Sequence, residues 1–290
     1  MHHGFIWLWC YFLNLNKSKM FKSFIQWCDY THNFWHGCRK LGIECAKCYL
    51  YRDKLKQGQD ASNIHRLLDQ TFFKPLFWKE SGRVFTCSYS DFFLEQADCW
   101  REDAWDVIKR TPWLTWMILT KRPERIKQCL PADWGQGWDN VWLGVSVGIQ
   151  SSFHRAKTLA EIPAKIRFIS AEPLLEELDF FIEENGKLLM SDFQWVILGG
   201  ESGDEFGPYK YRPCQISWIE KAVCQLRTIP TTAIFVKQLG SHLKKEMGLK
   251  GHHGGDPSEW PVHLRITEHP DNYNPDDRPE NKSSVKYVTL

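Results

Sequence analysis

The sequence predicts an α/β fold, a complete or partial (β/α) barrel of six to seven parallel strands. Two observations predict it. Short apolar, β-prone runs recur along the chain, and segments with apolar residues at helical spacing lie between them. Alternating strands and helices imply parallel pairing with right-handed crossovers. The length of 290 residues suits a single barrel domain.

The predicted strands are continuous in apolar residues, as in a sheet that is buried on both faces. Six of them are expected at residues 84–87, 116–119, 141–145, 166–169, 195–198 and 233–236, and a further short strand at residues 24–27. The spacing of apolar residues predicts helices at residues 96–109, 152–160 and 216–226.

The domain boundaries follow from the two ends of the chain. Residues 1–19 are interpreted as an N-terminal extension that is not native, with the true start at Met20, and residues 263–290 as a polar C-terminal tail. The barrel is therefore expected over residues 20–262. The apolar stretch at residues 5–13 is too short to span a membrane. It also lacks the basic flank and cleavage site of a signal peptide, so we expect a cytoplasmic protein without disulfides.

Composition limits the classes of partner. Hydrophobic residues make up 43% of the chain, which is enough for a packed core. The net charge is only +2, from 37 basic and 35 acidic residues. This balance argues against strong non-specific nucleic-acid binding, although it leaves room for a local basic groove. We also expect no membrane partner.

Polar or glycine-rich segments follow the predicted strands. Because the carboxyl ends of parallel strands meet at one edge of the sheet, where α/β folds carry their sites, these residues are expected to converge. Each of the polar ones could also simply cap the next helix. The candidates are Ser88, Ser90, Asp91, Lys121, Arg122, Ser146, Glu172, Gly199, Gly200, Glu201 and Lys237.

Three of the ten cysteines form a cluster, Cys38, Cys45 and Cys48, with spacing C-x6-C-x2-C. With a fourth ligand, such as His36 or Cys28, they could hold a tetrahedral zinc ion. With three ligands alone, a [4Fe–4S] cluster would keep one iron free of protein ligands, and S-adenosylmethionine could bind there. The position of the cluster before a β/α series, with no second cysteine pair at zinc-ribbon spacing, favours the iron–sulfur interpretation.

The cysteines lie in a longer motif that resembles a known family. The motif reads Trp27-x-Asp29-x-Thr31-x-Asn33-x-Trp35-x-Gly37-Cys38, then Cys45-x-x-Cys48-Tyr49. It resembles the opening of the phage-encoded three-cysteine-motif proteins of unknown function. Further strings at residues 119–125, 140–146, 167–175, 199–203 and 235–240 match in order, so the resemblance covers roughly residues 24–262.

The resemblance implies a radical-SAM-like fold, an iron–sulfur cluster and, in some members, a partner protein encoded nearby. It supplies no reaction. Phe34 and His36 depart from the family pattern without touching the three cysteines, and a histidine at position 36 leaves a histidine ligand conceivable.

The functional hypothesis is a radical S-adenosylmethionine enzyme that generates a 5′-deoxyadenosyl radical. Its substrate is unknown, with a nucleobase or nucleoside as one candidate small molecule. Cys38, Cys45 and Cys48 are expected to hold the cluster. Three groups of residues are expected to bind parts of the cofactor: its amino group is assigned to Ser88, Ser90 and Asp91, its carboxylate to Lys121 or Arg122, and its ribose to Ser146 and Glu172. Gly199 and Gly200 are expected to allow a close approach of the backbone to the cofactor. Glu201 and Lys237 are left for catalysis on the substrate.

Two alternatives stay open. One is a non-catalytic zinc protein that binds nucleic acid or a partner protein. The other is a metal-independent hydrolase that uses Glu172 and Glu201.

Overall fold

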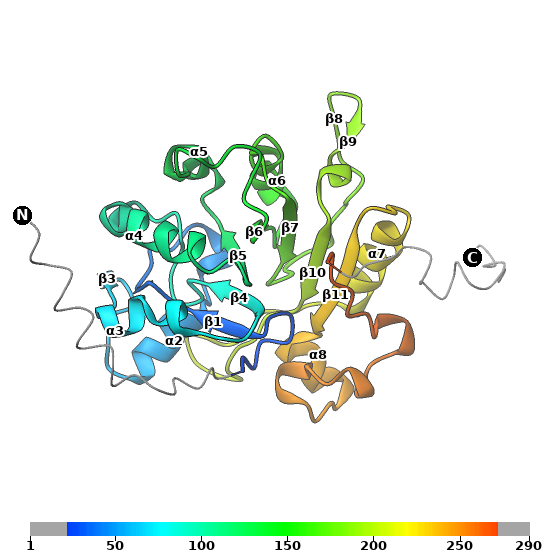
Figure 1. Cartoon of the computed structure of the whole chain (residues 1–290). Coiled ribbons are helices and arrows are strands. Elements are labelled where there is room, and N and C mark those ends of the chain that lie inside the picture. The colour runs from blue at the N-terminus through cyan, green and yellow to red at the C-terminus, as the bar shows by residue number, and fades with distance from the viewer. Residues whose placement is uncertain (1–21, 272–290) are drawn as a thin grey trace, which may run out of the picture.

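A seven-stranded parallel sheet forms the centre of the protein, whose computed structural model describes residues 22–271. Its order is β1-β4-β5-β6-β7-β10-β11. The strands are β1 (Tyr30–His32), β4 (Gly82–Thr86), β5 (Leu114–Thr120), β6 (Val141–Ser146), β7 (Ile166–Ala171), β10 (Trp195–Gly199) and β11 (Ala233–Gln238). The curved sheet runs from β1 at one edge to β11 at the other, without pairing between these two strands (Figure 1). The predicted α/β barrel is therefore confirmed in its partial form, a half-barrel.

Helices follow most of the strands and cover the outer face of the sheet (Figure 1). The three predicted helices are confirmed as α4 (Asp98–Lys109), α6 (Phe153–Ala160) and α7 (Ile216–Arg227). The helices are α2 (Tyr49–Lys56), α3 (Asp69–Phe72), α4 (Asp98–Lys109), α5 (Ile126–Cys129), α6 (Phe153–Ala160), α7 (Ile216–Arg227) and α8 (Gly240–Met247). Two small antiparallel pairs complete the fold, β2 (Trp35–His36) with β3 (His65–Arg66), and β8 (Glu183–Glu184) with β9 (Lys187–Leu188).

The first strand differs from the prediction. Residues 24–27 form a turn, closed by a bond from the Cys28 amide to the Ile25 carbonyl at 3.2 Å. The strand begins three residues after Trp27, where Tyr30 pairs with Val84 of β4. The apolar residue at position 27 is explained by burial and not by a strand: Trp27 packs against Phe85, with 4.6 Å between the ring centroids.

Both faces of the sheet are buried, which explains the continuous apolar strands. The outer face packs against the helices in the larger core. The inner face carries a smaller cluster, to which six strands contribute Phe85, Met117, Trp142, Phe168, Trp195 and Phe235. Gly144 of β6 is part of this packing, because a Cβ atom there would lie 2.3 Å from the ring of Phe168. The aromatic cluster fills the half-barrel from the amino-terminal side of the strands.

The packed domain extends beyond the expected boundary at residue 262. Leu264 and Ile266 are buried, and the Ile266 carbonyl accepts a bond from the Val236 amide of β11 at 2.9 Å. This segment pairs along the free edge of β11 and covers it, since an uncovered edge would invite pairing with other chains. The interpretation of residues 1–19 as an extension lies outside the described residues. Among the helices of residues 22–271, none is long and apolar enough to cross a membrane.

Candidate functional site

Five polar side chains stand in a row on the inner face, above the aromatic cluster and at the carboxyl ends of the strands. Because side chains alternate along a strand, Ser146, Ser170 and Lys237 lie on the same face as the inner residues two or four positions before them, and Lys121 and Glu172 follow directly after β5 and β7. We call them the polar row: Lys121, Ser146, Ser170, Glu172 and Lys237. Lys121 Nζ donates to Ser146 Oγ at 3.0 Å, and Ser170 Oγ to Glu172 Oε2 at 3.3 Å.

An ion pair joins the row across a strand. Lys237 Nζ lies 2.8 Å from Glu172 Oε1, although β10 separates β7 from β11. The pair forms because β10 contributes a glycine at this level: a Cβ atom on Gly199 would lie 2.6 Å from Glu172 Oε1. The neighbouring Gly200 serves a different purpose, close backbone packing, because its Cβ would meet the Leu239 carbonyl oxygen at 2.2 Å.

The segment Cys38–Cys48, here called the cysteine loop, is bonded to Arg122 after the end of β5, and Asp91 after β4 holds this arginine. Arg122 Nη2 donates to the Arg39 carbonyl at 2.6 Å, and its Nη1 lies 4.0 Å from Cys38 Sγ. Asp91 holds this arginine in place through a 3.0 Å ion pair in which both side chains are over 90% buried. Asp91 also accepts from the Thr120 hydroxyl at 2.7 Å and from the Lys121 amide at 3.1 Å.

A second anchor comes from inside the loop itself. Glu44 is buried, and its carboxylate accepts from the Gly148 amide at 2.7 Å and from the Ser152 hydroxyl at 2.8 Å. Its Oε2 also lies 2.6 Å from Arg155 Nη1 of α6. Three polar partners of a buried carboxylate fix its position, because any of them left unpaired would cost free energy. Glu44 thus ties the cysteine loop to the β6–α6 connection.

A third anchor leads from the end of β10. Glu201 is buried and receives three bonds from Arg212, one from its amide at 2.8 Å, one from Nε at 3.0 Å and one from Nη2 at 2.5 Å. Arg212 Nη1 then donates to the Ile43 carbonyl in the cysteine loop at 2.8 Å. Glu201 therefore acts on the loop through Arg212.

The Cys38 and Cys48 thiols are both largely buried near a cationic side chain. Burial, and after it the Asp91 carboxylate, raises the pKa of the Cys38 thiol to about 12. The Arg122 guanidinium lowers this pKa in part, whereas negative charge on Cys48 or Cys45 raises it further. Burial also raises the pKa of Cys48, and the positive charge of Lys121 is among the influences that lower it. A metal must therefore displace protons to bind these sulfurs.

Thiols are suitable ligands for a metal–sulfur centre, and Arg122 and Lys121 favour the thiolate forms of Cys38 and Cys48, although burial outweighs their effect on the pKa values. Within residues 22–271, however, no three His, Cys, Asp or Glu side chains are already arranged as metal ligands. The three sulfurs would have to move to surround one centre, so their shared site stays a prediction. Neither suggested fourth ligand contacts them: Cys28 packs in the inner aromatic cluster, and the His36 ring lies against Tyr89 and His65.

The other predicted site residues meet at the same edge, but several are occupied by the fold. Ser90 Oγ donates to the Gly37 carbonyl at 2.5 Å, directly before Cys38. Ser88 Oγ accepts from Asn33 Nδ2 at 3.2 Å. Together with Asp91 and Arg122, these residues hold the cysteine loop and its base. The residues that line the inner face, by contrast, are those of the polar row.

Sequence reasoning missed Glu44, Arg155 and Arg212. Two signals were available. Glu44 is the one acidic residue in a loop that otherwise carries Arg39, Lys40 and Lys47. Arg155 falls on the apolar face of α6, beside the buried Ala156 and Leu159. A charged residue on a buried face requires a partner, although the sequence does not name it.

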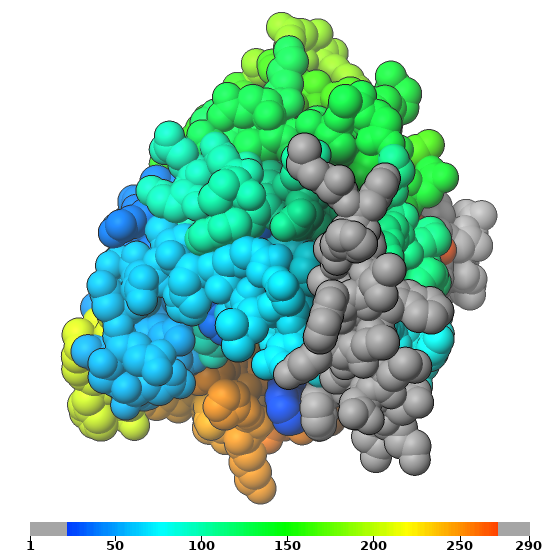
Figure 2. Space-filling model, turned by 60° about the vertical axis from the view of Figure 1, so that its left-hand side comes forward, coloured from blue at the N-terminus to red at the C-terminus, as the bar shows by residue number. Residues whose placement is uncertain are grey.

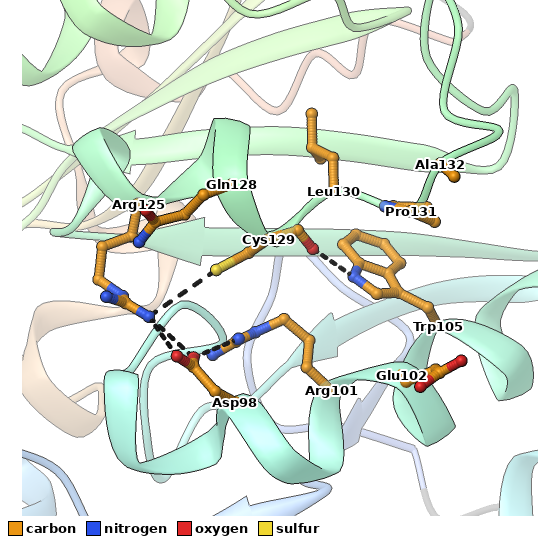
Figure 3. A pocket seen from close by; sticks show the side chains of 10 residues that line it. All are labelled: Asp98, Arg101, Glu102, Trp105, Arg125, Gln128, Cys129, Leu130, Pro131 and Ala132. Carbon is orange, nitrogen blue, oxygen red and sulfur yellow. Dashed lines mark hydrogen bonds and ion pairs between the residues drawn. The ribbon is translucent and has the colours of Figure 1, made fainter.

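A separate hollow of about 620 Å³ lies between α4 and α5, outside the sheet (Figure 3). Its charges satisfy one another: Arg125 Nη2 donates to both carboxylate oxygens of Asp98 at 2.8 Å, and Arg101 pairs with the same carboxylate at 2.5 Å. The hollow lies on the other face of the sheet from the polar row, so we assign it no part in the candidate site.

Comparison with known proteins identifies a family but no activity. The sequence profile of a family described as "Protein of unknown function (DUF5131)" matches residues 22–270. None of the curated proteins matches the chain significantly. The phage origin implied by the sequence resemblance stays a prediction.

Two solved structures are similar in part. Spore photoproduct lyase in complex with dinucleoside spore photoproduct aligns with a TM-score of 0.42 and 14% identity, over 64% of this chain and 59% of that one. A point mutant of spore photoproduct lyase aligns with a TM-score of 0.39 and 13% identity, over 63% and 59% of the two chains. The matched part of this chain therefore spans about three fifths of those proteins. A likeness this weak does not indicate the activity.

Proposed function

The chain belongs to the DUF5131 family, whose function is unknown, and from the site itself we propose that it is an iron–sulfur enzyme that uses S-adenosylmethionine for radical chemistry. One observation carries the proposal: three thiols lie on one loop, and residues at the carboxyl ends of the parallel strands hold this loop at that edge of the half-barrel. Cys38, Cys45 and Cys48 would hold a [4Fe–4S] cluster. Such a cluster supplies an iron without a protein ligand and an electron, which together allow reductive cleavage of S-adenosylmethionine to a 5′-deoxyadenosyl radical.

The residues around the loop divide into two groups. Asp91, Arg122 and Ser90 position the cysteine loop, and Glu201 does so through Arg212. The cationic side chains of Arg122 and Lys121 offset the negative charge of the thiolates. Asp91, first expected to bind the cofactor's amino group, is already saturated by protein donors, so we assign it to the loop.

The polar row is then left for the small molecules. Lys121 Nζ offers a cation beside Cys48 for the cofactor's carboxylate, and Ser146 lies next to it. Glu172 and Lys237 form a partly exposed pair on the same face, with side chains 13% and 24% exposed. A pair of this kind can orient hydroxyl or amide groups, since it offers both an acceptor and a donor. Gly199 keeps the space beside it free of a side chain.

The test is anaerobic purification and reconstitution, followed by measurement of iron, sulfide and zinc and of 5′-deoxyadenosine formed under reductant. We expect a coloured iron–sulfur protein that converts S-adenosylmethionine slowly, even without its substrate. Cys38→Ala, Cys45→Ala and Cys48→Ala should each lose the cluster and the product. Cys99→Ala, at an exposed position on α4, is the matched control and should keep both. A colourless zinc protein, or a full cluster that never cleaves the cofactor, would overturn the proposal.

A further inference from the structure

A second loop lies against the cysteine loop and extends its surface. Lys47 Nζ donates to the Pro208 carbonyl at 2.6 Å, and Lys56 of α2 pairs with Asp204 at 2.9 Å. Together with the bond from Arg212 to Ile43, these contacts join residues 201–212 to residues 38–56 as one continuous rim. Figure 2 shows the yellow loop against the light-blue segment at the lower left.

The rim carries an excess of positive charge. Its acidic residues are neutralised locally. Glu44 and Glu201 are buried against arginines, and the exposed or half-buried ones pair with basic neighbours: Asp53 with Arg52, Asp204 with Lys56, and Glu205 with Lys245. Five basic side chains of the rim, by contrast, make no ion pair with any described residue: Arg39, Lys40, Lys47, Lys54 and Lys210. This local excess contrasts with a net charge of +2 for the whole chain.

Aromatic side chains stand among these cations. Lys40 Nζ lies over the Tyr51 ring at 4.4 Å and near the Tyr209 ring at 5.6 Å, so it bridges the two loops. Phe206 is 77% exposed. It lies at the tip of a turn that is closed by a 3.0 Å bond from the Asp204 amide to the Tyr209 carbonyl. A turn fixed in this way presents the phenyl ring to solvent beside the basic residues.

We propose that this rim binds single-stranded nucleic acid. Cations along a groove bind the phosphates, and exposed aromatic rings stack on unpaired bases, which is the usual combination in proteins that bind single strands. A duplex offers no unpaired base to Phe206. A base that reaches the polar row beneath the rim must also leave its stack. The inference deepens the proposed function by naming its substrate class and rests on it for the reaction, whereas the binding itself needs no cluster.

The test is fluorescence anisotropy with a labelled oligothymidylate of about 12 nucleotides, measured over a series of salt concentrations. The triple variant Arg39→Gln, Lys40→Gln, Lys210→Gln should weaken binding about tenfold or more and lower the slope of log K against log salt by about 2. The control triple Lys79→Gln, Lys127→Gln, Lys165→Gln changes net charge equally at exposed positions outside the rim and should leave both unchanged. Phe206→Ala should weaken binding about tenfold with the slope unchanged.

Several results would overturn the inference. If the two triple variants weakened binding equally, net charge alone would explain the binding and the rim would have no special part in it. If the protein bound a duplex of the same length as tightly as the single strand, base stacking would not contribute to binding. The same conclusion would follow if Phe206→Ala bound the single strand as tightly as the wild type. Competition by polyglutamate as strong as by unlabelled oligonucleotide would indicate an acidic protein partner instead. Binding is measured on preparations with and without the cluster, so the two proposals fail separately: loss of cofactor cleavage leaves binding intact, and a protein that cleaves the cofactor but binds no oligonucleotide refutes only the rim.

Discussion

Glu44 and Arg155 form a buried ion pair, with 2.6 Å between Oε2 and Nη1 and with side chains only 1% and 8% exposed. Glu44 lies between Cys38 and Cys45, and Arg155 lies on α6, behind the end of β6. The position of the thiols therefore depends on a contact with a helix that carries none of the predicted ligands.

The first prediction concerns this pair. Glu44→Gln should lower the free energy of unfolding by about 3 kcal/mol, because the substitution leaves the Arg155 guanidinium buried without its counter-charge. It should also lower the iron bound per chain after reconstitution, because the loop loses an anchor. Denaturant titration and iron analysis measure the two effects.

The matched control is Glu184→Gln. It breaks an exposed ion pair between Glu184 and Lys157, which lies on α6 like Arg155. An exposed pair contributes about 0–1 kcal/mol, so little should change. Equal effects of the two substitutions would show that Glu44 does not anchor the loop.

The sequence predicted the sheet because its strands are apolar on both faces, and the site edge because polar residues follow those strands. It could not predict which polar residues face the interior and which hold the loop. Glu44 bonds to Gly148, which lies 104 positions away, and no local pattern encodes such a pairing. Asp91 and Lys121 looked alike as strand-end residues, yet the first lies under the loop and the second in the polar row.

The second prediction concerns Asp91. Asp91→Asn should destabilise the fold by about 3 kcal/mol, because it removes the charge opposite the buried Arg122. It also places an amide donor among the donors that Asp91 now satisfies. Asp106→Asn is the control, since Asp106 pairs with Arg110 on the surface of α4 with both side chains more than half exposed. Thermal melting should separate the two by about 6 °C or more. A wild-type melting temperature for Asp91→Asn would refute this account.

The third prediction concerns acid stability. His32 is buried, and its burial lowers the pKa of the imidazole to about 3. The unfolded chain has a pKa of about 6.5 there, so below that value it binds a proton that the folded protein excludes. Stability should therefore be complete above pH 6.5 and fall as pH drops toward 3. His36 and His253, whose pKa values burial lowers to about 4, add to the same trend.

His32→Gln removes this titration but keeps a donor that can reach the Phe72 carbonyl, now 3.3 Å from Nε2. The variant should be less stable at neutral pH, because glutamine packs less well against Phe34 and Trp116. Its stability should nevertheless fall less steeply with acid, by up to about 1.4 kcal/mol per pH unit. Urea titrations at several pH values provide the slopes, and parallel slopes for the two proteins would contradict a neutral, buried His32.

The last prediction separates two adjacent glycines by what their missing side chains would meet. At Gly200 a Cβ atom would lie 2.2 Å from the Leu239 carbonyl oxygen, which is backbone and cannot swing away. Gly200→Ala should therefore cost about 3 kcal/mol or more. At Gly199 the Cβ would meet the tip of the Glu172 side chain, which can rotate. Gly199→Ala should cost only about 1 kcal/mol, a loss of about 3 °C in melting temperature, because it displaces the carboxylate from Lys237.

If the polar row serves the small molecules, Gly199→Ala should have an effect beyond this small loss of stability. The variant should load its cluster like the wild type, since neither Gly199 nor the pair Glu172–Lys237 makes any of the contacts that anchor the loop. It should bind S-adenosylmethionine about tenfold more weakly, because the new methyl group occupies the space beside Glu172 and breaks its pair with Lys237. Equilibrium dialysis with the loaded protein measures the affinity. Wild-type affinity together with the expected small change in melting temperature would show that Glu172 and Lys237 only stabilise the sheet.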